Sequence, residues 1–133
     1  MNRTIRRTAV GAAVVSVALL SSSCGGSSSA SPSDKTLAPV QSGEVSISAG
    51  DNFFAPDVVT VTEGTQVTFT NQGRNQHNVL SVGETPFSVE TASFEPGQSY
   101  TWTATTPGTY QYYCSIHGNA TAGMTGTIQV VAP

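Results

Sequence analysis

Charged residues are scarce in this chain of 133 residues. They make up 10% of the sequence, whereas soluble domains usually contain about 25%. Basic residues are scarcest, because three of the five are Arg3, Arg6 and Arg7, which leaves two against eight acidic residues in the rest of the chain. Proteins that bind nucleic acids need clustered Lys and Arg to contact phosphates. The acidic body therefore excludes nucleic acid as a partner, and the short length excludes a multidomain enzyme.

Leucine and helical periodicity are also missing. Beyond the N-terminal segment, Leu occurs only at Leu37 and Leu80, and no window shows the 3.6-residue apolar stripe of an amphipathic helix. Val and Thr, which favour strands, and Ser and Gly, which favour turns, take their place. These absences exclude a helical bundle and predict an all-β body.

No apolar run is long enough to span a membrane. The longest run, Ala9 to Leu20, has twelve residues, and a membrane-spanning helix needs about 20. Because basic residues precede it, this run is typical of a signal peptide, which we predict over residues 1–23. Arg6-Arg7 leaves open whether the Sec or the twin-arginine route exports the chain.

Cys24 follows Leu19-Leu20-Ser21-Ser22-Ser23, which resembles the lipobox of bacterial lipoproteins. That resemblance implies a lipid on Cys24 that anchors the protein at the extracytoplasmic face of a membrane. Ordinary cleavage, which would give a soluble periplasmic or secreted protein, is the alternative. Residues 24–42 are rich in Gly, Ser and Pro and nearly uncharged, so we predict a flexible tether there. One domain remains, over residues 43–133.

Apolar and polar residues alternate throughout that domain. Turn sequences such as Glu63-Gly64 and Thr106-Pro107-Gly108 separate the alternating segments. Short strands with one apolar face, spaced in this way, predict a β-sandwich or barrel, here of about seven to eight strands. The apolar positions are Val45/Ile47, Val59/Val61, Val67/Phe69, Tyr100/Trp102, Tyr110/Tyr112 and Ile128/Val130.

Four side chains suited to metal binding lie close to the predicted strand ends. Cys114 and His117 close the predicted strand from Tyr110 to Tyr113, and His77 follows another. Met124 stands just before the last strand. A thiolate, two imidazoles and a thioether suit copper, in a trigonal His₂Cys site with a weak axial Met. Structural zinc sites usually have four Cys or His ligands, so the residue set favours copper.

The sequence around these residues resembles the cupredoxins, the small blue copper proteins, and in particular their plastocyanin-like branch. The resemblance covers essentially all of residues 43–133. It rests on His77-Asn78-Val79, on Tyr112-Tyr113-Cys114-Ser-Ile-His117 and on Gly123-Met124-Thr-Gly126. It implies a Greek-key β-sandwich with one copper ion per chain. The implied ligands are His77, Cys114 and His117 in the equatorial plane and Met124 on the axis, with Asn78 bracing the ligand loop by hydrogen bonding.

The spacing between His117 and Met124 departs from that family. Six residues, Gly118 to Gly123, separate the two, which is more than plastocyanin-like or amicyanin-like proteins usually have. A Met before a strand often packs in a core. Axial ligation and core packing therefore both stay open for Met124.

Two other interpretations of these residues are a disulfide and an immunoglobulin-like domain. A disulfide between Cys24 and Cys114 is conceivable in an oxidising compartment, but it competes with lipidation of Cys24. An immunoglobulin-like domain would use Trp102 and Tyr112 but needs a Cys on an earlier strand, and the sequence has none there. We therefore assign Phe69, Trp102, Tyr110 and Tyr112 to the core.

The resemblance implies a monomeric carrier of single electrons that is not an enzyme and that has another redox protein as its partner. Copper storage or delivery outside the membrane is an alternative, and a metal-free adhesion module is a third. If the chain is a carrier, we expect electrons to enter at His117. The apolar patch expected around it consists of Ile116, Gly118, Ala120, Ala122, Pro86 and Phe87.

Overall fold

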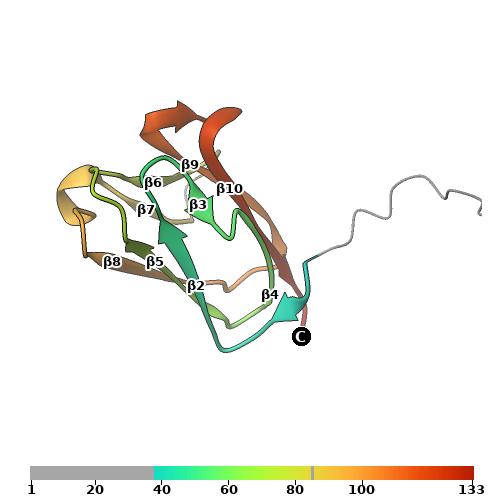
Figure 1. Ribbon diagram of the computed structural model, residues 1–133. Helices are drawn as coiled ribbons and strands as arrows, with labels where there is room; N and C mark the ends of the chain where they lie inside the picture. Colours follow the sequence, from blue (N-terminus) through green and yellow to red (C-terminus); the bar gives the residue numbers. More distant parts are fainter. Residues whose placement is uncertain (1–37, 85) are drawn as a thin grey trace, which may run out of the picture. The chain divides into compact units, whose positions relative to one another are not determined.

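The computed structural model describes residues 38–84 and 86–133, which form two β-sheets (Figure 1). The spatial order of strands is β1-β4-β10-β9-β6-β7 in the first sheet and β3-β2-β5-β8 in the second. Within this part of the chain no helix is long and apolar enough to cross a membrane. The elements are β1 (Val40–Gln41), β2 (Glu44–Ala49), β3 (Phe54–Ala55), β4 (Val58–Thr62), β5 (Gln66–Asn71), β6 (Val79–Ser81), β7 (Ser88–Val89), the 3₁₀ turn η1 (Thr91–Ser93), β8 (Ser99–Thr103), β9 (Gly108–Asn119) and β10 (Ala122–Val131).

The alternating sequence pattern directs one face of each sheet into a common core. Val45 and Ile47 of β2 and Val67 and Phe69 of β5 are buried, while the Ser and Thr residues between them are partly or fully exposed. Ile128 of β10, in the other sheet, belongs to the same cluster of buried residues. Burial of one such side chain contributes about 1.5–3 kcal/mol to stability. The predicted all-β sandwich is therefore confirmed.

Aromatic side chains fill the centre of this core. The ring centroid of Tyr112 lies 4.9 Å from that of Phe54, 5.2 Å from that of Phe69 and 6.1 Å from that of Phe87. Trp102 packs on Phe87 at 4.6 Å. Such edge-to-face and tilted arrangements are favourable beyond simple area burial. The predicted core positions of Phe69, Trp102 and Tyr112 are confirmed.

The described part of the chain has ten strands rather than the expected seven to eight. Three of them, β1, β3 and β7, have two residues each and lie at sheet edges. Short edge strands leave few unpaired backbone groups for other chains to pair with. β1 falls inside the range predicted as tether and pairs in parallel with β4. The predicted signal peptide, Cys24 and most of the predicted tether lie outside the described residues.

β9 and β10 are the longest strands, and a tight turn at residues 119–122 joins them. In Figure 1 this orange-red hairpin stands at the end of the domain opposite the C-terminus. The first half of β9 pairs regularly with the second half of β10, from Gly108 opposite Val130 to Tyr113 opposite Thr125. That ladder positions the candidate site, which begins where its regular pairing stops.

Candidate metal centre

The predicted ligands come from two segments that are far apart in the sequence. His77 lies in the loop between β5 and β6, and Cys114 and His117 lie in the second half of β9. The expectation that Cys114 and His117 close a strand at Tyr113 is wrong, because β9 continues to Asn119. The fold brings the three side chains together at the hairpin end of the sandwich.

The ligand segment is a large bulge in the β9–β10 ladder. Tyr113 pairs with Thr125, and the next pair is Gly118 with Gly123. Four residues of β9, at positions 114–117, thus face Met124 alone on β10. Extra residues on one strand bend it and redirect its side chains. The bulge therefore allows Cys114 and His117, three residues apart, to direct their side chains toward one point.

Three donor atoms form a nearly regular triangle at that point. Cys114 Sγ lies 3.7 Å from His77 Nδ1 and 3.8 Å from His117 Nδ1, and the two nitrogens are 3.2 Å apart. The centre of a triangle with these sides is about 2.1 Å from each atom, close to the roughly 2.0–2.3 Å of metal–nitrogen and metal–sulfur bonds at zinc. The site thus fits a transition-metal ion in trigonal His₂Cys coordination, which is the equatorial set of a blue copper site.

His77, like Cys114, has no exposed surface. Burial lowers the pKa of its imidazole, the neighbouring His117 lowers it further, and Asp51 and the Gly50 carbonyl oppose these effects. Among the described residues, its Nε2 is buried and has no hydrogen-bond partner. A neutral imidazole is the form that binds a metal, so the surroundings of His77 favour its binding form.

Asn78 braces the ligand segment from the neighbouring loop. Its Nδ2 donates a hydrogen bond of 2.8 Å to Ser115 Oγ, and its Oδ1 accepts one of 2.8 Å from the Ser115 backbone amide. Ser115 directly follows the ligand Cys114. This reciprocal pair ties the bulge of β9 to the loop that contains His77, and it is the contact expected of Asn78.

The sequence matches a known family model. The model for copper-binding proteins of the plastocyanin/azurin family matches residues 41–131. This chain belongs to that family. The match covers all the site residues described above, so the metal that fits the triangle is copper, with one ion per chain. The protein is a copper-binding electron-transfer protein.

Individual relatives agree with the family assignment. A chloroplastic plastocyanin from Oryza sativa subsp. indica is 33% identical over 130 residues, which are 92% of this chain and 76% of the plastocyanin. A solved amicyanin variant in its reduced state superposes with a TM-score of 0.56 at 25% identity, over 67% of this chain and 83% of the amicyanin. A copper-containing nitrite reductase from Thermus scotoductus also has a TM-score of 0.56 at 29% identity, over 68% of this chain and 23% of the reductase.

Met124 is where this member of the plastocyanin/azurin family departs from the usual spacing. The six residues between His117 and Met124 form a compact hairpin tip, with Asn119 opposite Ala122 and Gly118 opposite Gly123. The strand therefore returns to the site despite the added length. Met124 is 1% exposed and directly opposes the ligand bulge.

The prediction of an apolar surface patch around His117 is wrong for one of its residues, Phe87. Phe87 is 3% exposed and packs in the aromatic core on Trp102, so it cannot contribute to a surface. Ile116, by contrast, is 48% exposed, and His117 is partly exposed. Pro86, Ala120 and Ala122 are exposed as expected. The alternation of apolar and polar residues would predict the burial of Phe87 only if β7 were recognised as a strand. A strand of two residues is too short to show that alternation in the sequence.

Two features of the hairpin tip were not predicted from the sequence as part of the site. Asn119 Oδ1 accepts hydrogen bonds from the Thr121 backbone amide at 2.9 Å, the Thr121 hydroxyl at 2.9 Å and the Ala122 amide at 3.1 Å. Gly118 and Gly123 face each other across the tip. The signal available in the sequence was Gly118-Asn119 followed by Gly123, because Gly and Asn are typical of turns.

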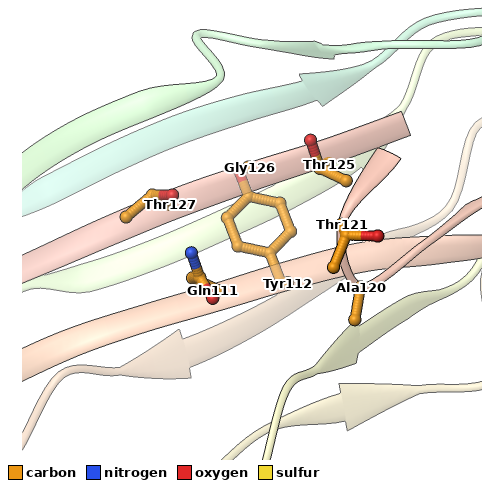
Figure 2. Close-up of a pocket in the computed structure, with 7 residues that line it drawn as sticks. All are labelled: Gln111, Tyr112, Ala120, Thr121, Thr125, Gly126 and Thr127. Atoms are coloured by element: carbon orange, nitrogen blue, oxygen red, sulfur yellow. The ribbon is translucent and has the colours of Figure 1, made fainter. Parts of the chain in front are cut away.

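A pocket of about 310 Å³ adjoins the hairpin on the side of the regular ladder (Figure 2). The ring of Tyr112 spans from β9 to β10 there, with its hydroxyl at Gly126. None of the three ligands lines the pocket. Its lining residues are Gln111, Tyr112, Ala120, Thr121, Thr125, Gly126 and Thr127.

Proposed function

We propose that His77 and His117 bind the copper through Nδ1 and Cys114 through Sγ, that Met124 is the weak axial ligand, and that the protein passes single electrons between other redox proteins. Copper, when bound, supplies one-electron chemistry between Cu(II) and Cu(I). The observation that supports this proposal is the His₂Cys triangle, whose dimensions suit a metal ion. A site held in one geometry reorganises little when its charge changes.

The chain's own residues provide that rigidity. The Asn78–Ser115 hydrogen bonds fix the bulge, and the complete burial of His77 and Cys114 excludes water from two ligands. His117 is the ligand that remains partly exposed. We therefore place the electron path at the His117 ring edge.

The axial role of Met124 is tested by substitution. An oxygen donor stabilises Cu(II), whereas loss of the thioether favours Cu(I). Met124→Gln should lower the reduction potential and Met124→Leu should raise it, both measured by voltammetry on copper-loaded protein. Potentials that move in neither variant would remove Met124 from the site and assign it to the core.

The surface around His117 is proposed to dock the redox partner. Ile116 is 48% exposed, and Gly118, Ala120 and Ala122 offer small apolar surfaces on the same hairpin. Weak electron-transfer encounters bury little area and dissociate quickly. Ala120→Glu should slow electron exchange with a redox protein and leave the absorption spectrum unchanged. Exchange at the unaltered rate would place the docking surface elsewhere.

We propose no catalytic activity and a monomeric state. Both histidines of the chain belong to the one site, so none is left for a second copper.

Storage or delivery of copper is the competing function. Retention of the metal distinguishes an electron carrier from a storage or delivery protein. A carrier exchanges electrons rapidly and keeps its copper against a chelator, whereas a delivery protein releases copper readily to an acceptor of similar affinity.

We also propose that the chain is exported and anchored by a lipid on Cys24. The basic N-terminus, the short apolar run and the lipobox-like sequence support this proposal. Stable anchoring needs more than one acyl chain. The full-length protein should partition with membranes, and Cys24→Ala should release it. Wild-type protein found entirely in the soluble fraction would contradict anchoring and leave a periplasmic or secreted carrier.

A further inference from the structure

We propose that Gly118 and Gly123 are positioning residues that set the distance of Met124 from the copper plane. The proposal rests on the axial role of Met124 proposed above. It assigns a function to the longer hairpin tip by which this chain departs from its family. The two glycines form the first pair of the ladder beyond the ligand bulge. The distance between their backbones therefore determines how close β10 lies to β9 at Met124.

Gly118 is in contact with the backbone that leads to Met124. A Cβ built on Gly118 would lie 2.6 Å from the Ala122 carbonyl oxygen and 2.7 Å from the Met124 amide nitrogen. Both atoms are backbone, so no side chain can rotate away to make room. A side chain at position 118 would therefore push β10, and Met124 with it, away from β9.

Gly123 makes the reciprocal contact with the other strand. A Cβ on Gly123 would lie 2.5 Å from the His117 carbonyl oxygen and 2.7 Å from Gly118 Cα. Its φ of +87° also lies in the left-handed region that favours glycine. One glycine thus abuts the backbone of the axial ligand, and the other abuts the backbone of an equatorial ligand.

The rest of the tip holds this close approach in place. Asn119 Oδ1 accepts three hydrogen bonds from Thr121 and Ala122, which close the turn. Ala120 and Thr121 line the same pocket as Gln111 and Thr125 of the regular ladder (Figure 2). The tip is therefore held rigid at its turn. Its extra residues restrain the two strands next to the site and do not make the site flexible.

The test compares glycines that touch the site with matched glycines that do not. Gly118→Ala and Gly123→Ala are made in the full-length, copper-loaded protein. Gly108→Ala is the control for Gly118, because the atoms nearest to a Cβ there belong to the Tyr110 side chain and lie at an ordinary contact distance of 3.6 Å. Gly64→Ala is the control for Gly123, because it has a φ of +90° but nothing within 4 Å. The readouts are the ratio of reduced to oxidised copper at a fixed applied potential, the visible and EPR spectra, and unfolding of the copper-free protein.

We expect Gly118→Ala to raise the reduced-to-oxidised ratio at least tenfold, which is about 59 mV for one electron, because a more distant thioether favours Cu(I). Gly123→Ala should shift the ratio at least as far and also alter the EPR spectrum. The two controls should leave the ratio and spectra unchanged. Unchanged ratios in both site variants, with copper bound, would overturn the proposal.

Asn119→Ala decides the question if the glycine variants fail to fold. It removes three hydrogen bonds without adding an atom, and it should shift the ratio in the same direction as Gly118→Ala. An unshifted ratio would contradict the proposal. Met124→Leu distinguishes failure of the positioning role of the glycines from failure of the axial role of Met124. If it shifts the potential and the tip variants do not, only the positioning role fails, whereas no shift in Met124→Leu means that the axial ligand itself is wrongly assigned.

Discussion

The two halves of the β9–β10 hairpin have opposite structural properties. From Gly108 to Tyr113, β9 pairs residue by residue with β10, and its inward-facing Tyr112 packs in the aromatic core. Beyond Tyr113 the register shifts, four residues of β9 face Met124, and the inward-facing groups are metal donors. One continuous pair of strands thus contains both a regular ladder and a metal site.

The metal site is rigid although the bulged half has no apolar core of its own. The regular half has the buried apolar surface that drives folding, and it fixes the direction in which the bulged half leaves the sheet. The bulged half is fixed by hydrogen bonds instead, between Asn78 and Ser115 and from the turn residues to Asn119 Oδ1. Changes in the regular half should therefore affect stability, and changes in the bulged half should affect the copper.

The largest expected effect is loss of the copper chromophore in the bulged half. Cys114 Sγ is the sulfur atom of the donor triangle, and charge transfer from a bound thiolate to Cu(II) makes such sites intensely blue. Cys114→Ser should abolish the visible band after addition of Cu(II), with the fold retained by circular dichroism. Cys24→Ser is the matched control and should remain blue with one copper per chain. An equally blue Cys114→Ser protein would refute the site assignment.

The next effect belongs to the regular half. A Cβ at Gly126 would overlap the ring and hydroxyl of Tyr112, which is packed among Phe54, Phe69 and Phe87. Overpacking of a core typically costs about 1–3 kcal/mol. Gly126→Ala should lower the free energy of unfolding by that amount in denaturant titrations and leave the blue band unchanged. A shifted spectrum with unchanged stability would contradict the proposal that the regular half determines stability and the bulged half determines the properties of the copper.

Asn78→Ala tests the connection between the site and the rest of the sandwich. It removes two hydrogen bonds to Ser115, each with a net value of about 0.5–1.5 kcal/mol. We expect the copper-free protein to lose about 1–3 kcal/mol of unfolding free energy and electron self-exchange to slow, because a looser ligand segment reorganises more. Asn75→Ala, whose Nδ2 bonds instead to the Asp51 carbonyl, is the control and should keep the wild-type exchange rate.

The smallest effect is expected at Tyr112, in the direction of stabilisation. Its hydroxyl is buried without a hydrogen-bond partner among the described residues, and burial, with Asp57 nearby, raises the pKa of the phenol. A buried unpaired polar group is unfavourable, so Tyr112→Phe should raise the free energy of unfolding by about 1 kcal/mol. The copper spectrum should not change. A clear loss of stability, measured by urea titration, would show that the hydroxyl makes a favourable contact.

The sequence by itself determined the fold class and the chemistry of the site. Period-two alternation needs only local backbone geometry to place Val45, Ile47, Val67 and Phe69 on one face. The ligand set follows from residue type, because a lone thiolate with two imidazoles suits copper wherever the fold brings them together. The residue types of His77, Cys114 and His117 predict them as ligands, and the donor triangle consists of these three residues.

Only the tertiary structure decided how those residues meet. The burial of Phe87 and the pairing of two-residue strands depend on neighbours that are distant in sequence, which local patterns do not encode. Whether six residues after His117 separate Met124 from the site or return it depends on a contact between two glycine backbones. A spacing counts residues along the chain, but the distance between two side chains depends on the path of the backbone, and here a hairpin folds that path back on itself.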